Sequence, residues 1–380
     1  MRITVAIDSF KGSLPSLVSG EAVKCAAERV FDDVTVNIRP LADGGEGTVD
    51  AIISANNGEL ITLDVKGPLE KTVKASYGLV KRTNTAVIEM SSAAGITLLS
   101  REELNPYKTT TYGVGELIRD AIFKNARRFV IGIGGSATND GGVGMLKALG
   151  FEFLDSAGNP IENGAIGLSK LAKIKCDNAL KELSECEFLV ACDVKNPLCG
   201  EHGASAVYGP QKGATPEMVR NMDNWLKEYA RLTKEVKPGA DENCEGTGAA
   251  GGMGFALMAY LGARLTSGIE LVMRETSLEE YIKDSDIVVT GEGRLDGQSA
   301  MGKAPVGVAK LAKKYSKLVI AFSGCVTDDA VLCNKNGIDA FFPILRAPVS
   351  LSEAMDVENA RKNLSSAAEQ AFRLIKALTK

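Results

Sequence analysis

Residues 3–13 read Ile-Thr-Val-Ala-Ile-Asp-Ser-Phe-Lys-Gly-Ser, and residues 286–296 read Asp-Ile-Val-Val-Thr-Gly-Glu-Gly-Arg-Leu-Asp. Each stretch begins with a short apolar run, typical of a buried strand, and continues into a loop that mixes glycine with charged side chains. A helical pattern follows in both places, starting near Ser13 and at Lys303. Strand and helix in alternation predict a parallel, doubly wound sheet whose loops gather at the carboxyl ends of the strands.

The middle of the chain follows a different pattern. Apolar and polar residues alternate over 73–79, a polar turn occupies 81–85, and a further apolar run covers 87–90. This spacing predicts a β-hairpin, so antiparallel pairing enters the fold there. The later apolar runs at 129–133 and 188–191 each end in a loop with polar side chains.

The length of 380 residues is large for one hydrophobic core, and two domains are expected. Because the two chain ends share the strand-and-helix pattern, we expect residues 1–62 and 284–380 to form one parallel-sheet domain. Residues 63–283 then form an inserted, mixed α/β domain. The predicted fold class is therefore α/β, with two unlike α/β domains.

Charge and hydropathy exclude several function classes. The net charge of −4 gives no electrostatic reason to bind nucleic acid or an anionic membrane. The longest apolar stretch, around 255–261, is far shorter than the about 20 residues that a membrane helix needs. Eight scattered cysteines do not resemble a disulfide framework, and the N-terminus shows no signal-peptide organisation. We therefore expect a cytoplasmic protein.

One glycine motif imitates a dinucleotide-binding fingerprint. The stretch Gly132-Ile-Gly134-Gly-Ser-Ala137 fits GxGxxA after an apolar run, and Asp155 lies 21 residues beyond Gly134. The loop continues as Thr-Asn-Asp-Gly-Gly142, however, which is far more polar than a turn leading straight into a packed helix. This continuation disfavours a dehydrogenase.

A second motif imitates a P-loop. Residues 297–304 read Gly-Gln-Ser-Ala-Met-Gly-Lys-Ala, so alanine stands where a P-loop carries the Ser or Thr that holds magnesium. The first glycine also lies several residues beyond the strand expected at 286–290. A standard P-loop is thus disfavoured, although Lys303, Gln298 and Ser299 near a helix start could still contact phosphate. A solvated lysine is the plainer alternative.

The chain contains one histidine, His202, which weakens any mechanism based on a catalytic triad or a histidine-rich metal site. Cys192, Cys199 and His202 lack the paired spacing of zinc ligands and are more simply explained by packing. Carboxylates, lysines, hydroxyls and backbone amides remain, and kinases use that set.

Charged side chains follow the predicted strands, among glycines. Carboxylates beside glycine loops would repel a phosphate unless a divalent cation lies between the two charges. Any one of them alone would be read as a solvated surface group, but their joint placement after strands favours metal-assisted phosphoryl transfer. They are Asp8 and Lys11, Asp43 and Glu46, Asp193, and Glu292 and Asp296.

In these residues and the motifs around them, the chain resembles the bacterial class I glycerate kinases over essentially its whole length. The resemblance implies transfer of the γ-phosphoryl group of ATP to D-glycerate with Mg²⁺, usually to give 2-phosphoglycerate. It also implies a flavodoxin-like domain and a second, restriction-enzyme-like domain. The motifs that carry it are Asp8-Ser-Phe-Lys-Gly-Ser13, Asp43-Gly-Gly-Glu-Gly-Thr48, Gly134-Gly-Ser-Ala-Thr-Asn-Asp-Gly-Gly142, Cys192-Asp-Val-Lys-Asn-Pro-Leu198, Tyr208-Gly-Pro-Gln-Lys-Gly213 and Thr290-Gly-Glu-Gly-Arg-Leu-Asp296.

Site roles can then be assigned as hypotheses. A hydroxyl nucleophile needs a base or a positioning carboxylate, and Asp193 is the first candidate, with Lys11 and Asp8 completing the catalytic group. The candidates for holding glycerate are Gly134, Gly135, Ser136, Asn139 and Arg294. The nucleotide and phosphate candidates are Gly291, Gly293, Gln298, Ser299, Lys303 and Lys212. Magnesium is assigned to Asp296 and Glu292, with Asp43 and Glu46 behind them.

Three alternatives stay open at this point. The product could be 3-phosphoglycerate, as for some members of the family, or the acceptor could be another small hydroxy acid. A different class is a non-catalytic sensor that binds a sugar acid, but no basic helix-turn-helix stands out. The expected partners are D-glycerate and ATP, without nucleic acid or membrane, and a homodimer is left open.

Overall fold

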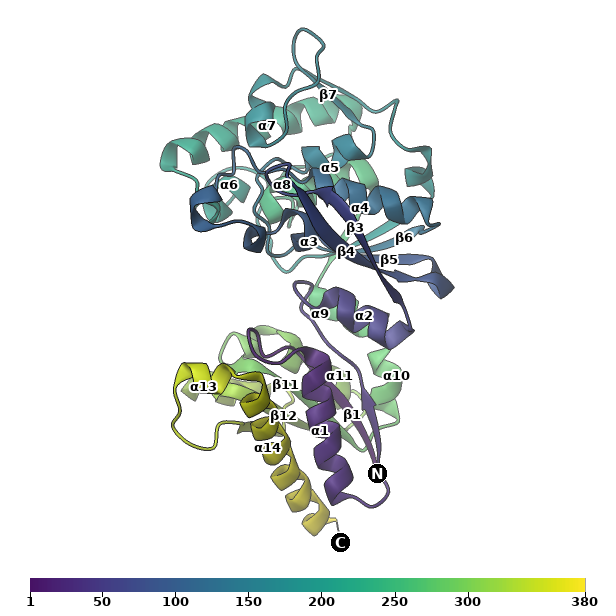
Figure 1. Cartoon of the computed structure of the whole chain (residues 1–380), viewed down its shortest axis with the longest axis vertical. Helices are drawn as coiled ribbons and strands as arrows, with labels where there is room; N and C mark the ends of the chain where they lie inside the picture. Colours follow the sequence, from purple (N-terminus) through teal and green to yellow (C-terminus); the bar gives the residue numbers. More distant parts are fainter. Residues whose placement is uncertain (380) are drawn as a thin grey trace. The chain divides into compact units, whose positions relative to one another are not determined.

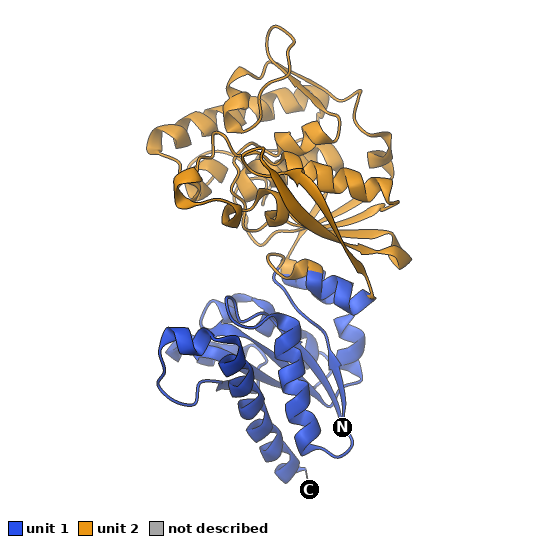
Figure 2. Ribbon diagram, in the orientation of Figure 1, with its two compact units in different colours: residues 1–43, 50–56, 269–380 blue, residues 44–49, 57–268 orange. Residues whose placement is uncertain are grey.

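The computed structural model describes residues 1–379, which divide into two compact units (Figure 2). Unit 1 comprises residues 1–43, 50–56 and 269 onward, and unit 2 comprises residues 44–49 and 57–268. Each unit has a β-sheet and a hydrophobic core of its own.

The unit boundaries differ from the expected division at both crossings of the chain. Strand β3 (Glu59–Lys66) belongs to unit 2 because it pairs antiparallel with β4 (Thr72–Val80) along its whole length. Helix α10 (Leu278–Lys283) belongs to unit 1, since Thr4 on the first strand donates a hydrogen bond to the carbonyl of Tyr281 (3.2 Å). Residues 44–49 also join unit 2.

The sheet of unit 1 is entirely parallel, as the shared pattern of the two chain ends predicts. Ile3 is in register with Ile287, and Val288 with Val319, so strands far apart in the sequence lie side by side. Counted in chain order, the five strands are arranged 2-1-3-4-5, which is the flavodoxin-like order. In spatial order they are β13 (Ala340–Pro343), β12 (Leu318–Val326), β11 (Ile287–Leu295), β1 (Arg2–Ile7) and β2 (Thr35–Ile38).

Helices cover both faces of this sheet because strand side chains alternate between the faces. Ile3, Val5 and Ile7 join a core with α1 (Ser16–Val30) and α14 (Val357–Leu378), which run side by side in Figure 1. Helix α11 (Ala304–Lys313) packs on β11 and β12. The remaining helices of this part are α2 (Thr48–Asn56), α9 (Gly268–Glu275), α12 (Leu332–Lys335) and α13 (Leu351–Met355).

The main sheet of unit 2 is mixed. Strands β3, β4 and β5 pair antiparallel, which confirms the hairpin, and the sheet continues in parallel through β5, β6, β9 and β10. A separate two-stranded sheet is formed by β7 and β8. The bounds are β5 (Thr85–Glu89), β6 (Arg128–Gly132), β7 (Glu152–Leu154), β8 (Lys173–Lys175), β9 (Glu187–Ala191) and β10 (Arg264–Thr266).

Helices and aromatic side chains fill the core of unit 2. The rings of Phe129 and Phe188 stack at 4.8 Å on neighbouring strands, and Tyr229 meets Phe255 edge to face at 5.4 Å. Because Gly115 has no side chain, α4 approaches α5 closely. The helices are α3 (Ser91–Ala94), α4 (Tyr112–Phe123), α5 (Val143–Ala148), α6 (Ala204–Tyr208), α7 (Pro216–Val236) and α8 (Ala249–Leu261).

Among residues 1–379, no helix combines the length and the apolar character needed to cross a membrane. All eight cysteines lie in this part of the chain and carry free thiols.

Candidate active site

A cavity of about 450 Å³ opens in unit 1 at the carboxyl ends of β1 and β11. The chain leaves these two adjacent strands in opposite directions, towards β2 and towards β12, so a crevice forms between their loops. Such a switch point is the usual ligand site of an open parallel sheet. Its charged lining residues are Asp8, Lys11, Asp43, Glu292, Arg294, Asp296 and Lys303.

Asp8 is the most perturbed carboxyl group of this cavity. It follows β1 directly, is 5% exposed and accepts a hydrogen bond from the Ser9 amide (2.7 Å). Burial first, and then repulsion by Asp43, raise the pKa of Asp8 to about 7. Glu292 adds to the rise, while Lys11 opposes it. A cation placed beside this group would therefore meet a concentration of carboxylates with little water to screen them.

Lys11 lies at the exposed rim of the same cavity. Its Nζ donates a hydrogen bond to Asp43 Oδ2 at 3.0 Å. Burial of the stem works against the charged form, but Asp43 and Asp8 outweigh it and raise the pKa of Lys11. The side chain thus stays cationic and can reach an anionic ligand.

The loop after β11 is organised by Asp296. Its Oδ1 accepts hydrogen bonds from the backbone amides of Gln298 (3.0 Å) and Ser299 (3.1 Å). The buried hydroxyl of Ser299 in turn donates to Glu292. Burial, before any neighbouring charge, raises the pKa of Glu292. Both carboxylates line the cavity, but Asp296 is engaged by the backbone of its own loop, whereas Glu292 accepts a hydrogen bond from the Ser299 side chain.

Two basic side chains flank this loop. Arg294 Nε lies 3.4 Å from Asp296 Oδ2, and Lys303 Nζ lies 4.0 Å from Asp296 Oδ1. Lys303 immediately precedes α11, as its position in the sequence predicts. The strand is longer than expected, however, and continues to Leu295, so Gly297 comes two residues after its end. The extension follows from parallel pairing of β11 with β12 up to Val326.

In unit 2, Asp140 is a buried residue of the loop 134–142, 1% exposed, and its carboxylate ties the loop to the protein interior. Its carboxylate accepts hydrogen bonds from Thr111, through the amide at 2.8 Å and the hydroxyl at 2.9 Å. The amides of Gly142 (3.1 Å) and Gly144 (3.2 Å) also donate to it. Burial nevertheless raises the pKa of Asp140 against these bonds. The group shapes the loop and is closed to a ligand.

Lys212 contacts the buried side of the same loop and is 1% exposed. Its Nζ donates to the hydroxyl of Ser136 at 2.8 Å and to the carbonyl of Thr138 at 2.7 Å. Burial lowers the pKa of Lys212 to about 7, although Asp140 acts in the opposite direction. The structure therefore groups Lys212 with the residues assigned to glycerate, and not with the phosphate candidates of unit 1.

The surface of this loop is formed by Gly134 and Gly135, which are exposed, while Asn139 is fully buried. Asn139 Nδ2 donates to Ser205 Oγ at 2.9 Å. Within residues 1–379, Asn139 Oδ1 has no hydrogen-bond partner. Asn139 therefore supports the loop from inside, and its direct contact with a ligand stays a prediction.

Asp193 lies in the open at the end of β9, and its Oδ1 accepts a hydrogen bond from the Gly268 amide (3.1 Å). Strands β6 and β9 are parallel neighbours, with Gly132 opposite Ala191, so the 134–142 loop and Asp193 follow the same edge of the sheet. Glu46 is exposed in unit 2, on a loop whose Gly44 carbonyl lies against Gly132. Asp43, by contrast, belongs to unit 1 with Lys11.

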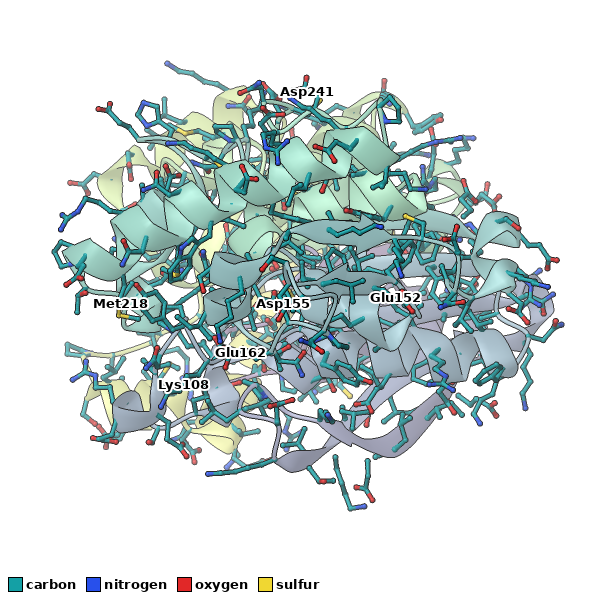
Figure 3. All side chains as sticks on the ribbon, turned by 90° about the horizontal axis from the view of Figure 1, so that it is seen from above. Lys108, Glu152, Asp155, Glu162, Met218 and Asp241 are labelled. Carbon is teal, nitrogen blue, oxygen red and sulfur yellow. The ribbon has the colours of Figure 1, made fainter. Side chains whose placement is uncertain are left out.

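The dinucleotide interpretation fails at Asp155. This residue lies in the turn after β7, where Oδ1 accepts hydrogen bonds from the amides of Ala157 and Asn159, both at 2.9 Å. Figure 3 places Asp155 on the face of unit 2 that is seen from above. Its carboxylate therefore completes a surface turn and has no part in the loop of Gly134.

A second glycine segment supports the loop and was missed from the sequence. Ala250, Gly251 and Gly252 have left-handed φ values of 53°, 71° and 92°. A Cβ on Gly251 would lie 2.1 Å from the carbonyl oxygen of Thr138, so only glycine allows the two backbones to touch. The sequence feature that could have revealed this segment is its glycine content, since five of the nine residues 246–254 are glycine.

Comparison with known proteins gives consistent matches along the whole chain. A family model described as "Glycerate kinase family" matches residues 3–376. A protein of Haemophilus influenzae named "Glycerate kinase" is 45% identical over 375 residues, covering 99% of both chains. "Glycerate 2-kinase" of Escherichia coli is 46% identical over 354 residues, covering 93% of each. A crystal structure from Salmonella typhimurium LT2, provisionally described as glycerate kinase 2, superposes with a TM-score of 0.92 at 44% identity and covers 100% of this chain and 99% of that one.

Proposed function

Because this chain belongs to the glycerate kinase family and is a glycerate kinase, we propose that ATP is its phosphoryl donor and 2-phosphoglycerate its product. The observation that carries the proposal is the family match over residues 3–376, joined to a relative that is named for the 2-position. D-Glycerate is the proposed acceptor.

We assign the nucleotide to the cavity of unit 1. Its position at the switch point of a flavodoxin-like sheet supports the assignment, as does the mixture of glycine backbone and cationic side chains around it. Lys11 and Arg294 would contact phosphate oxygens, and Lys303 lies at the start of α11, where the free amides of the helix favour anions. Gly293 of β11 lines the cavity and would let a ligand approach the backbone, whereas Gly291 is buried against the Phe322 carbonyl of β12. Gln298 and Ser299 shape the adjoining loop.

The carboxylates of this cavity fit Mg²⁺. The ion is commonly held by one or two carboxylates together with substrate phosphates and water. Within residues 1–379 no three acidic, cysteine or histidine side chains form a closed metal site, so the phosphates would complete the coordination. Glu292 and Asp8 are the proposed ligands, because both line the cavity and directly follow the paired residues Ile7 and Gly291 of the adjacent strands β1 and β11. Asp296, engaged by its own loop, would orient Ser299 and Glu292. When bound, Mg²⁺ would neutralise charge on the transferred phosphoryl group.

We assign glycerate to the carboxyl edge of the sheet of unit 2. The exposed amides of Gly134 and Gly135 and the hydroxyl of Ser136 suit the substrate carboxylate, with Lys212 donating to Ser136 from behind. Asp193 is exposed at the same edge and is held by the Gly268 amide. It is the proposed base that accepts the proton of the attacking hydroxyl. Asn139 and Ser205 would keep the loop in shape.

Product analysis tests the proposal directly. The enzyme is incubated with ATP, Mg²⁺ and D-glycerate, ADP release is followed by a coupled assay, and the product is examined by phosphorus NMR. Phosphate on carbon 2 couples to a single proton and gives a doublet, whereas phosphate on carbon 3 couples to two protons and gives a triplet. A triplet would replace the proposed product by 3-phosphoglycerate. ADP release with another hydroxy acid, but not with D-glycerate, would change the acceptor.

A further inference from the structure

One wall of the unit 1 cavity is apolar and differs from the charged lining already described. Leu345, Leu351, Ala354 and Met355 line it, and three of them leave large side-chain fractions in the open. Leu351 is 78% exposed, and Leu345 and Met355 are each 37% exposed. A soluble protein gains nothing from leaving such side chains grouped at the mouth of a cavity, unless a ligand covers them.

Helix α13, which carries three of these residues, contributes no fully buried side chain to a hydrophobic core. None of its five residues is buried. Its start is nevertheless well defined, since the Glu353 amide donates to Ser350 Oγ (3.3 Å) and the Ser350 amide donates to Glu353 Oε2 (2.9 Å). The helix is therefore formed by local capping, and its apolar side chains are presented to the cavity.

The apolar wall adjoins the loop that holds Asp8 and Lys11. An added Cβ on Gly12 would lie 2.9 Å from Met355 Cε, so the methionine lies directly over the β1–α1 loop. The cavity thus has charged side chains at one end, from Lys11, Glu292 and Lys303, and the apolar side chains of α13 at the other. A nucleoside triphosphate has the same polarity, with a flat, largely apolar base at one end and phosphates at the other.

We propose that Leu345, Leu351, Ala354 and Met355 form the nucleobase subsite of the enzyme and bind a purine by apolar contact. The proposal rests on the proposed function, because it places the base of the nucleotide whose phosphates are assigned to the same cavity. Three of the four side chains carry no hydrogen-bonding group, and the thioether of Met355 is only a weak acceptor. Apolar pockets discriminate weakly between ligands that differ in polar substituents, so ATP and GTP should both serve as donors.

Steady-state kinetics on the full chain test the subsite. Leu351→Asp and Met355→Asp should each raise the KM for ATP by about 10-fold or more, since burial of such a side chain is worth a factor of this size or larger. The KM for D-glycerate should stay within about 2-fold. In the unmodified enzyme, kcat/KM for GTP should lie within about 100-fold of that for ATP, the range typical of an apolar pocket. Titration calorimetry with ADP alone gives the same comparison without turnover.

Two control variants separate contact from charge. Met355→Leu keeps the apolar volume and should leave the KM for ATP nearly unchanged. Leu374→Asp introduces the same charge at an apolar residue of α14 that is 57% exposed and does not line the cavity, and it should have no effect. Melting temperatures verify that the exposed substitutions leave the fold intact.

The outcomes distinguish this inference from the proposed function. If the unmodified enzyme phosphorylates D-glycerate with ATP but the Asp variants keep its KM and its ADP affinity, the subsite is wrong and the function stands. A preference for ATP over GTP above about 1,000-fold would also overturn it, because a polar readout of the base would be required. Failure of the unmodified enzyme to use ATP at all would overturn both.

Discussion

Lys212 Nζ lies 2.8 Å from the hydroxyl oxygen of Ser136, in a position where the lysine is 1% exposed. Its other hydrogen bond goes to the Thr138 carbonyl, so the buried amine is hydrogen-bonded only to neutral groups, and Asp140 offsets the cost of burying its charge only in part. Burial of a charge that is not fully paired is costly, and an anion that binds at Ser136 would reduce that cost. The relationship therefore links the electrostatics of this loop to substrate binding and to pH.

Stability should depend on pH through Lys212. The pKa of Lys212 is lowered to about 7 in the folded protein, against 10.5 ordinarily. Between these values the unfolded chain binds a proton that the folded chain does not, so the free energy of unfolding should rise as the pH is raised from 7 towards 10. Lys212→Met should remove at least about 1 kcal/mol of this rise. Urea unfolding across the pH range measures it.

Lys108→Met is the matched control, because Lys108 is an exposed lysine of the same unit, labelled in Figure 3. This variant should keep the pH dependence of the unmodified protein. Parallel stability profiles for Lys212→Met and the unmodified chain would show that Lys212 is charged in the folded state and that the burial argument is wrong.

Asp193→Asn should lower kcat by about 100-fold or more, the scale of losing a general base. Size and the hydrogen bond to the Gly268 amide are kept, and only the capacity to accept a proton is removed. The melting temperature should not change, since Asp193 is exposed. Asp241→Asn, at another exposed carboxylate of unit 2, serves as the control. A near-normal kcat for Asp193→Asn would move the role to another carboxylate.

Glu292→Gln should raise the Mg²⁺ concentration needed for half-maximal activity by about 10-fold, because a neutral amide is a weaker ligand than a carboxylate. Removal of the metal with a chelator should abolish activity in both proteins, and added Mg²⁺ should restore it. Glu358→Gln changes an exposed glutamate that pairs with Arg361 and should leave the Mg²⁺ titration unchanged. An unaltered titration for Glu292→Gln would remove Glu292 from the metal site.

Gly251→Ala should destabilise unit 2 far more than Gly262→Ala does. Both glycines have left-handed φ values, 71° and 63°, so both variants carry a conformational cost of about 1 kcal/mol. Only at Gly251 would the new Cβ lie 2.1 Å from a carbonyl oxygen, whereas nothing lies within 4 Å at Gly262. Equal losses in the free energy of unfolding would show that the two loops do not touch as described.

Local pattern was sufficient to predict the parallel sheet and the hairpin. The apolar runs at 3–7 and 286–290 predict strands that end in polar loops, and the structure pairs Ala6 with Thr290. Unit boundaries were predicted less well. The expected boundary at residue 62 divides strand β3, because burial alternates along this largely exposed strand and its sequence gives only a weak strand signal. Its place is set by pairing with β4, which the sequence of β3 alone does not reveal.

The family, the alternation of strands with helices and the motifs of the candidate site loops could all be predicted from the sequence, because each depends on residues close together in the chain. Which polar groups are buried and which are open to a ligand depends instead on contacts between residues far apart in the chain. Lys212 and Ser136 are 76 residues apart, and Asp140 and Thr111 are 29 apart. Burial and hydrogen bonding at such separations depend on how strands and loops pack. Two motifs can therefore each supply a site candidate, Asn139 and Asp193, while the fold buries the first and exposes the second.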